Sequence, residues 1–438
     1  MLKLKSLFTA VVLFSAVLSL GVMAAAAPVN LTFYYPVSVS GPLAQVIDSM
    51  VQEFNSSHPG INVSPVFAGG YNDTLLKVQA ATMGGTPPDV AILLSTDLYT
   101  LKALDAISPL DSFIQADADG QAYINDFFPA LMANSQFNGE IWSIPFQRST
   151  PILYYNKDMF AEVGLDPNKP PTTWDELVAY GKKLLKLNAD GTVARWGFEV
   201  PFSGGFIWNF EAFIYETGCP GCNQVKIVSD DGTHVNFTSQ HILAALNFFK
   251  DLSTVYKIMP NGAINWGTVP SDFLAGRAGM VYHSTGSLTN MLKNASFNVG
   301  VAPMPGLSCY GTPTGGGNFY VFKGAPQDHQ KAAWEFIRWM TSPEKAADWS
   351  IASGYIAVRK SAYNTKAMLD FTASHPEYLV ARDQLKYAHK EFSSYERAKV
   401  TKILFDQLAR AVLGEVTPEQ ALEEAQTQAD QVLANFKK

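Results

Sequence analysis

The sequence predicts an α/β protein built from two lobes. Segments with the alternation of a β-strand are followed by segments with the periodicity of an amphipathic helix, which is the pattern of a sheet covered by helices. The chain of 438 residues holds more of this material than one lobe needs, and no repeat, low-complexity linker or block of like charge divides it. Two lobes joined by segments that cross back and forth explain the missing linker.

The N-terminal part of the chain has the clearest elements. Residues 31–35 are rich in β-formers, and apolar side chains then recur over 43–54 at the spacing of one helix face. Residues 61–67 return to strand alternation, and Tyr71 opens a second helix after two glycines. The run 90–94 is continuously apolar, which is typical of a strand buried on both faces. This order predicts a mostly parallel sheet covered by helices.

Capping signals identify later helices. Thr173 and Glu176 form a capping box, in which each side chain satisfies a backbone amide at the start of a helix. Thr417 and Gln420 form a second box ahead of the last helix. Helical periodicity also returns between the two boxes, over residues 242–255 and 332–340.

The first 26 residues carry the pattern of a secretory signal peptide. Lys3 and Lys5 precede an apolar run over 7–23, and residues 24–27 are all alanine. We expect residues 1–26 to be removed, by a cut before Ala27 or two residues earlier, and the mature protein to be periplasmic. The alternative is a retained anchor, although a spanning helix needs about 20 apolar residues with anchoring flanks.

The charge balance argues against a nucleic-acid partner. The chain has 32 Lys and Arg against 39 Asp and Glu, for a net charge of −7, whereas nucleic-acid binders present a basic surface. Charged residues make up 16 %, and the aromatic residues are 28 Phe, 18 Tyr and 8 Trp. This composition is typical of a large folded protein with aromatic-lined surfaces.

The cysteines leave more than one interpretation open. Cys219 and Cys222 enclose a Pro-Gly pair, while Cys309 stands alone. A C-x-x-C string can be a redox motif or half of a zinc site, but here it lacks the second pair of ligands that zinc needs. We expect a small structural disulfide between Cys219 and Cys222 in an oxidising compartment, with no metal and no cofactor.

The chain lacks the motifs of common enzymes. It has no G-x-S-x-G, H-E-x-x-H or Walker pattern, and no G-x-G-x-x-G after a strand. One S-x-x-K string begins at Ser342, but Pro343 directly after it indicates a helix N-cap. We expect binding without turnover. An exported glycosidase-like enzyme is the alternative, because its two carboxylates need not lie close in sequence.

Several longer strings resemble one protein family. They are spread from about residue 30 to the C-terminus, at 69–72, 147–158, 170–177, 284–288, 315–318, 353–356 and 396–397. Together they resemble the extracytoplasmic solute-binding proteins of bacterial sugar ABC importers. The stretch from Ser149 to Lys157 is specific to that superfamily, and its combination with Tyr355 and Arg397 resembles the glycerol-phosphate branch.

The resemblance implies a two-lobed periplasmic-binding-protein clamp with a multi-segment hinge. We expect lobe 1 to contain residues 27–145 and 288–342, and lobe 2 to contain residues 146–287 and 343–438. Such a protein is a monomer that captures a small phosphorylated polyol or sugar and hands it to the membrane permease subunits of an ABC importer. The implied ligand is glycerol-3-phosphate or a related glycerophosphodiester. An oligosaccharide or other sugar is the alternative.

The same resemblance assigns a phosphate site. Arg397 is expected to hold the phosphate through its guanidinium fork. The alternative for this residue is a surface salt bridge with Glu391 or Glu396. Gly315 and Gly316 are expected to bring backbone amides close to phosphate oxygens, unless they form only a turn.

Hydroxyl and aromatic side chains complete the implied site. Tyr71 is expected to pack on glycerol carbons, and Asn72 stands where the glycerol-phosphate branch has an acidic residue, which leaves the far end of the ligand open. For Tyr71 and Tyr355 the alternative is a place in the core, and for Ser149 and Ser287 it is a cap or a turn. The hydroxyl donors are Tyr355, Ser149 and Ser287, the other aromatic residues are Phe202, Phe206 and Trp208, and Arg148 is a possible extra cation.

Overall fold

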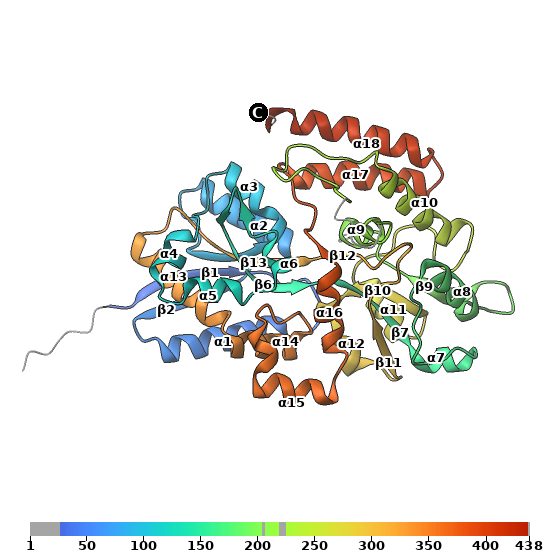
Figure 1. Ribbon diagram of the computed structural model, residues 1–438, viewed down its shortest axis with the longest axis horizontal. Helices are drawn as coiled ribbons and strands as arrows, with labels where there is room; N and C mark the ends of the chain where they lie inside the picture. The colour runs from blue at the N-terminus through green and yellow to red at the C-terminus, as the bar shows by residue number, and fades with distance from the viewer. Residues whose placement is uncertain (1–26, 204–205, 219–224, 437–438) are drawn as a thin grey trace, which may run out of the picture.

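The computed structural model describes residues 27–203, 206–218 and 225–436. The expected signal peptide (1–26) and the expected disulfide of Cys219 and Cys222 lie outside the described residues. Two five-stranded sheets, each covered by helices, form two lobes that lie at the left and right of Figure 1. This is the α/β architecture that the sequence predicts.

The first sheet combines N-terminal strands with one that comes much later in the chain. In order across the sheet, the strands are β2 (Ile61–Phe67), β1 (Val29–Tyr35), β3 (Val90–Leu94), β13 (Gly315–Val321) and β6 (Ile144–Ser149). β1 pairs in parallel with β2 and β3, whereas β13 runs antiparallel to both of its neighbours.

The second sheet is also mixed. In order, its strands are β11 (Val299–Ala302), β7 (Pro151–Asn156), β10 (Ala278–Ser284), β9 (Val193–Glu199) and β8 (Lys186–Leu187). Only β9 and β10 pair in parallel. The predicted parallel pairing is confirmed for the strands from which it was made, β1, β2 and β3. Strands that enter from the opposite lobe, such as β13 and β7, are antiparallel to their neighbours, so that each whole sheet is mixed.

Helices bury both faces of the first sheet. They are α1 (Leu43–Ser57) and α13 (Gln327–Met340) on one face, and α2 (Tyr71–Met83) and α3 (Leu98–Ala103) on the other. Strand β3 divides its side chains between them: Val90 and Ile92 belong to the core beneath α1 and α13, while Ala91 and Leu93 belong to a separate cluster beneath α2 and α3. The prediction of a strand buried on both faces is confirmed.

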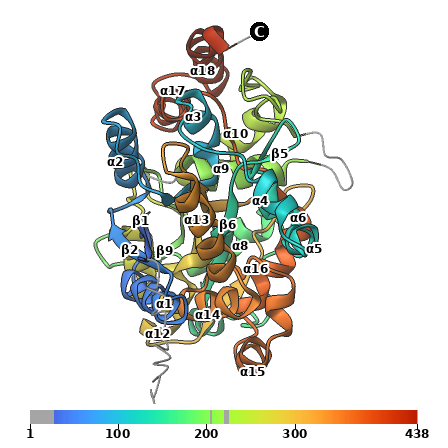
Figure 2. The same ribbon diagram turned by 90° about the vertical axis from the view of Figure 1, so that its left-hand side faces the viewer.

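The second lobe carries most of the remaining helices. α8 (Trp174–Leu184) and α11 (Thr268–Leu274) pack on its sheet, beside α9 (Phe206–Glu216) and α10 (Gln240–Thr254). The C-terminal pair, α17 (Arg397–Val412) and α18 (Pro418–Leu433), packs on α10 and lies at the top of Figures 1 and 2.

The two predicted capping boxes differ in how they are completed. Thr417 and Gln420 form the full reciprocal pair at the start of α18. At α8, Thr173 Oγ1 accepts from the backbone N–H of Glu176 at 3.2 Å, but the Glu176 carboxylate accepts from the N–H of Thr172, at 2.7 Å. The return bond is therefore made one residue earlier than the motif predicts.

The chain crosses between the lobes more than once. β6 ends at Ser149 and β7 begins at Pro151, so that Thr150 alone joins a strand of one sheet to a strand of the other. A short parallel pair, β12 (Thr312–Pro313) with β14 (Ala388–His389), lies between the two sheets (Figure 1).

The expected lobe boundaries differ from the observed pairings at two places. β11 falls within 288–342, but it pairs with β7 in the second sheet. Helix α14 (Pro343–Ser353) falls within 343–438, but it packs against α1 on the first lobe. The chain therefore passes between the lobes at more places than the expected boundaries allow, and β11 and α14 fall on the wrong side of them.

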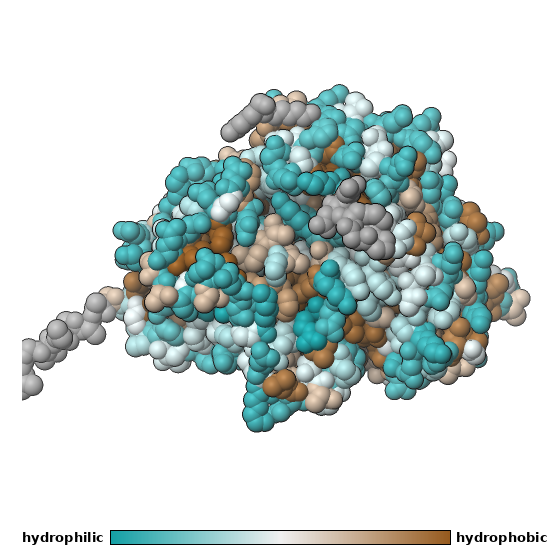
Figure 3. Space-filling view, in the orientation of Figure 1, coloured by the Kyte–Doolittle hydropathy of each residue, from teal (hydrophilic) through white to brown (hydrophobic). Residues whose placement is uncertain are grey.

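Among residues 27–203, 206–218 and 225–436, we find no helix that combines the length and the apolar character needed to cross a bilayer. The face shown in Figure 3 is mostly hydrophilic, and its hydrophobic residues form small separate patches.

Candidate ligand-binding cleft

A cavity of about 700 Å³ lies between the lobes. Its walls come from the ends of strands and the starts of helices in both lobes, a usual place for ligand sites in α/β proteins. The predicted site residues that line it are Tyr71, Asn72, Ser149, Phe206, Trp208, Gly316, Tyr355 and Arg397. Sequence reasoning did not single out other lining residues, among them Ser38, Asp73, Trp266, Ser284, Thr401, Lys402 and Phe405.

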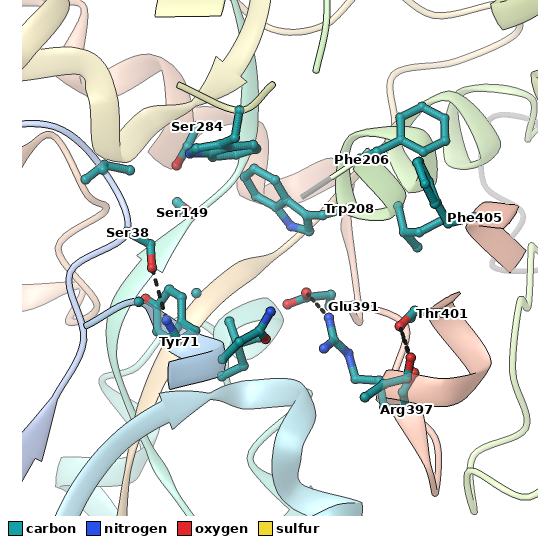
Figure 4. Close-up of a pocket in the computed structure, with 18 of the residues that line it drawn as sticks. Ser38, Tyr71, Ser149, Phe206, Trp208, Ser284, Glu391, Arg397, Thr401 and Phe405 are labelled. Carbon is teal, nitrogen blue, oxygen red and sulfur yellow. Dashed lines mark hydrogen bonds and ion pairs between the residues drawn. The ribbon is translucent and has the colours of Figure 1, made fainter. Parts of the chain in front are cut away.

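Tyr71 lies in the wall that the first lobe supplies. It begins α2, where the Asp73 carboxylate accepts from the backbone N–H of Gly70 at 3.0 Å and so caps the helix. The Tyr71 hydroxyl donates to Gln147 Oε1 at 2.9 Å, and its backbone N–H donates to Ser38 Oγ at 3.3 Å (Figure 4). These bonds hold the ring against the cleft wall.

The two predicted glycines lie in strand β13, and at each of them another part of the protein comes too close to leave room for a Cβ. Gly316 has a φ of +95°, and a Cβ there would lie 1.9 Å from the carbonyl oxygen of Gln147. A Cβ on Gly315 would lie 2.3 Å from Nε1 of Trp208, which donates to the Thr314 carbonyl at 3.0 Å. Gly316 therefore lines the cleft, whereas Gly315 lies against the Trp208 ring and is not among the lining residues.

Arg148 is an internal structural cation. It is fully buried, and its guanidinium donates to the Gly316 carbonyl at 3.1 Å, to Asn318 Oδ1 at 3.2 Å and to Thr314 Oγ1 at 2.9 Å. These bonds tie β6 to β13. The possible role as an extra ligand cation does not fit this placement, because Arg148 is not among the lining residues.

Two serines at the ends of strands supply hydroxyls to the cleft. Ser149 ends β6, and Ser284 ends β10, where its Oγ accepts from the backbone N–H of Gly286 at 3.0 Å. Ser287 does not line the cleft, because its buried hydroxyl lies 2.9 Å from Nδ1 of His283. In this segment, the serine that lines the cleft is therefore Ser284, at the end of β10, and not Ser287 in the turn that follows.

Aromatic rings form the wall on the second lobe. Trp208 and Trp266 meet with ring centroids 6.0 Å apart at an angle of 52°. Phe206 and Phe405 lie beside them, 5.8 Å apart (Figure 4). Phe202 is 4 % exposed and packs edge-on behind Phe206, so it belongs to the core of the lobe and not to the cleft lining.

Tyr355 reaches the cleft from the segment after α14. That helix ends at Gly354, whose φ of +90° turns the chain, and the backbone N–H of Tyr355 donates to Ser353 Oγ at 3.1 Å. Burial raises the pKa of Tyr355 to about 12. Its hydroxyl therefore stays protonated at neutral pH, and it interacts with the Tyr71 side chain.

Arg397 faces a carboxylate in the cleft. It begins α17, and its Nη2 lies 3.8 Å from Oε1 of Glu391 (Figure 4). The Glu391 side chain is 3 % exposed and that of Arg397 is 20 % exposed. Within the part of the chain that the structure describes, Arg397 Nε and Glu391 Oε2 have no hydrogen-bond partner. An ion pair with Glu391 is therefore present, but it lies in the cleft rather than on the surface.

Two further carboxyls are buried near this pair. Glu211 Oε2 accepts from the backbone N–H of Phe392 at 2.8 Å, and Asp97 Oδ2 accepts from that of Leu94 at 3.1 Å. Burial raises the pKa of Asp97 to about 6, although Arg397 acts to lower it. Burial, together with the Glu391 charge, holds the pKa of Glu211 well above its usual range.

The described residues contain one cysteine and no cluster arranged to bind a metal ion. Among them, no cluster of three or more His, Cys, Asp or Glu side chains is arranged to hold a metal ion. Cys309 is a free thiol with its Sγ 3.7 Å from the carbonyl oxygen of Tyr215.

A two-lobed α/β protein with a polar and aromatic cleft between its lobes has the architecture of a solute-binding protein. Residues 49–377 match the family described as bacterial extracellular solute-binding protein, and the chain belongs to that family. The resemblance stated from the sequence is thereby confirmed.

Its relatives include proteins named for one ligand. The chain is 29 % identical over 436 residues to the sn-glycerol-3-phosphate-binding periplasmic protein UgpB of Escherichia coli O1:K1, with 96 % of each chain covered. It is 27 % identical over 434 residues to UgpB of Pectobacterium atrosepticum, covering 96 % of this chain and 94 % of the relative.

Solved structures show the same fold with different ligands. UgpB from Mycobacterium tuberculosis in complex with glycerophosphocholine is 24 % identical, with a TM-score of 0.77 over 93 % of this chain and 98 % of that one. The cyclic α-maltosyl-1,6-maltose binding protein from Arthrobacter globiformis is 25 % identical, with a TM-score of 0.77 over 93 % of this chain and 100 % of that one.

Proposed function

We propose that this protein is the periplasmic substrate-binding component of an ABC importer, and that it binds glycerol-3-phosphate or a glycerophosphodiester without turnover. The observation that carries the proposal is Arg397, a guanidinium at the cleft with an N–H that no described residue accepts. The UgpB relatives, named for glycerol-3-phosphate and matched over 96 % of this chain, support the same ligand class.

The start of α17 adds to the attraction for an anion. Arg397, Ala398 and Thr401 all come from the first turns of this helix, and all three line the cleft. The N-terminus of a helix carries a partial positive charge and N–H groups without helical partners. A phosphate between the Arg397 fork and this helix start meets charge and donors together, and the Tyr355 hydroxyl is a further donor.

The rest of the cleft suits the remainder of a glycerophosphodiester. Tyr71 offers a ring face for the glycerol carbons, and Asn72 and Asp73 offer hydrogen-bond partners for hydroxyls. Trp208 and Trp266 form an aromatic corner for the second substituent of the phosphate. Because these groups come from both lobes, a bound ligand favours the closed arrangement that the permease subunits would recognise.

The aromatic corner also favours a second candidate ligand, an oligosaccharide. Sugar rings pack on aromatic faces, and Trp208 and Trp266 lie side by side in the cleft. The similar fold of the Arthrobacter globiformis protein, which is named for a cyclic maltosyl-maltose, is compatible with this candidate.

Binding and turnover can be tested in one experiment. Purified protein is titrated by calorimetry with glycerol-3-phosphate, glycerophosphocholine and maltotriose, and each mixture is then followed by chromatography for products. We expect the two phosphate compounds to bind and to be recovered unchanged, and native mass spectrometry to show a monomer. Binding of maltotriose alone would replace the ligand assignment, and conversion of any compound would contradict a binding role.

A further inference from the structure

Glu391 lies in an unusual electrostatic setting for a residue that lines a proposed anion site. Its side chain is 3 % exposed and forms an ion pair with Arg397, and no other carboxylate among the described cleft residues has both properties. The titratable groups that face it are Asp97 before α3, Glu211 and Tyr215 on α9, Arg148 on β6, Tyr71 on α2, Tyr320 on β13 and Arg397 on α17. Burial raises the pKa of all three tyrosines, so they remain neutral and do not compensate any charge.

The charges of this cluster balance only while the cleft holds no anion. Arg148 and Arg397 supply two positive charges, and Glu211 is held neutral by the rise in its pKa. Asp97 and Glu391 can then match the two guanidinium groups. An anionic phosphate beside Arg397 adds negative charge where Glu391 already stands 3.8 Å from the same guanidinium. Two anions cannot share one partly buried cation without a large electrostatic cost.

We propose that Glu391 is an internal counter-ion of Arg397, and that a bound phosphate displaces it by driving the uptake of one proton onto its carboxylate. The proton comes from solvent, Glu391 becomes a neutral carboxylic acid, and the guanidinium is left to the phosphate. The inference rests on the proposed function. It adds that Glu391 sets both the strength and the pH dependence of anion binding.

The geometry singles out Glu391 within the cluster. Glu391 lines the cleft, whereas Asp97 and Glu211 do not. The carboxyl groups of Asp97 and Glu211 each accept a hydrogen bond from a backbone N–H, which holds them in place. Glu391 Oε2 has no hydrogen-bond partner among the described residues, although the nearby Ser95 side chain acts to lower the pKa of this carboxyl. The pair itself is loose, since 3.8 Å is longer than a charge-assisted hydrogen bond.

The direction of the pH dependence follows from this exchange. Burial raises the pKa of Glu391 in the protein without ligand, and a neighbouring anion raises it further. Between these two pKa values, binding takes up a proton, and affinity falls as pH rises. One proton sets the limit at about tenfold in the dissociation constant for each pH unit.

Glycerophosphocholine is the probe of choice, because a phosphodiester lacks the second phosphate ionisation near pH 6 that would complicate a monoester. The full chain is titrated by calorimetry from pH 5.5 to 8.5. At each pH, two buffers with different ionisation enthalpies are used, because the difference between the two observed binding enthalpies gives the number of protons taken up. For the wild type, we expect little uptake at pH 5.5, where Glu391 is already protonated, and above its pKa of about 7 an uptake approaching one proton with an affinity that falls several-fold for each pH unit. Glu391→Gln should bind more tightly than the wild type at pH 8 and show neither effect.

Glu199→Gln is the matched control. Glu199 is a carboxyl that is 1 % exposed, with a pKa raised to about 8, but it lines a separate cavity of about 230 Å³ beside α11. This variant should keep the proton uptake and the pH slope of the wild type. If uptake persists in Glu391→Gln, another carboxyl takes the proton and the assignment is wrong.

The remaining outcomes separate the inference from the proposed function. Binding by the wild type without proton uptake would overturn the inference and leave the function intact. No binding of glycerophosphocholine or glycerol-3-phosphate at any pH would overturn both. If Glu391→Gln fails to fold, the proton count of the wild type decides alone.

Discussion

Replacing Arg397 by alanine tests the ligand class directly. The guanidinium offers a phosphate two parallel charge-assisted hydrogen bonds, each of about 1.5–3 kcal/mol. Part of this gain is offset, because the ligand takes Arg397 away from Glu391, and that loose, partly solvent-screened pair at 3.8 Å contributes about 1 kcal/mol. We therefore expect a loss of about 3 kcal/mol, which is about 150-fold in the dissociation constant for glycerol-3-phosphate.

The assay is calorimetry with glycerol-3-phosphate and with maltotriose. Arg397→Lys should recover only part of the loss, since an ammonium group offers a point charge instead of a fork. Lys402→Ala is the control on the same helix: Lys402 also lines the cleft, but its side chain is 72 % exposed and 2.7 Å from Asp406, so less than about 1 kcal/mol should be lost. An equal loss for both ligands, or no loss at all, would refute the phosphate assignment.

Three further predictions follow from glycine, histidine and tryptophan positions. Gly316→Ala should lower the free energy of unfolding by about 3 kcal/mol in denaturant titrations, because the new Cβ would overlap the backbone of Gln147. Gly139→Ala is the control: Gly139 also has a positive φ, of +83°, but no atom lies within 4 Å of its Cβ position, so this variant should lose only about 1 kcal/mol. Burial lowers the pKa of His283 to about 4, below its value of about 6.5 in an unfolded chain, so the stability that its neutral ring confers is complete above pH 6.5 and is lost as pH falls toward 4. Unfolding measured at pH 7 and pH 4.5 should show a smaller difference in a His283→Gln variant, and an unchanged difference would contradict the assignment. Trp208→Ala should weaken glycerophosphocholine about tenfold in calorimetry and leave glycerol-3-phosphate within a few-fold; an equal effect on both would place the ring at the phosphate end instead.

The local elements of the fold were predictable because their signals are local. The apolar spacing over 43–54 and the continuous run over 90–94 report directly on which faces are buried, and both elements form as expected. The glycine-rich start of β13 gave no such signal, since glycine weakens strands and suggests a turn. Its place between β3 and β6 depends on contacts with segments more than 150 residues away.

Site residues that belong to a motif could be predicted from the sequence, whereas the direction in which an individual side chain points could not. Arg397 and Tyr355 belong to recognisable strings, and both line the cleft. Phe202 and Ser287 stand within a few residues of lining positions, but their side chains turn into the core or onto His283. Which of two neighbours faces a cavity depends on packing that a single sequence does not reveal.

The place of β13 between β3 and β6 has a consequence for how the chain folds during synthesis. β1, β2, β3 and β6 are complete once residue 149 has left the ribosome, yet their sheet has a gap until residues 315–321 arrive. Until then β3 and β6 each present an unpaired edge, and closing the sheet requires contacts of high sequence separation. The N-terminal lobe is therefore the first to be made and among the last parts of the protein to be finished.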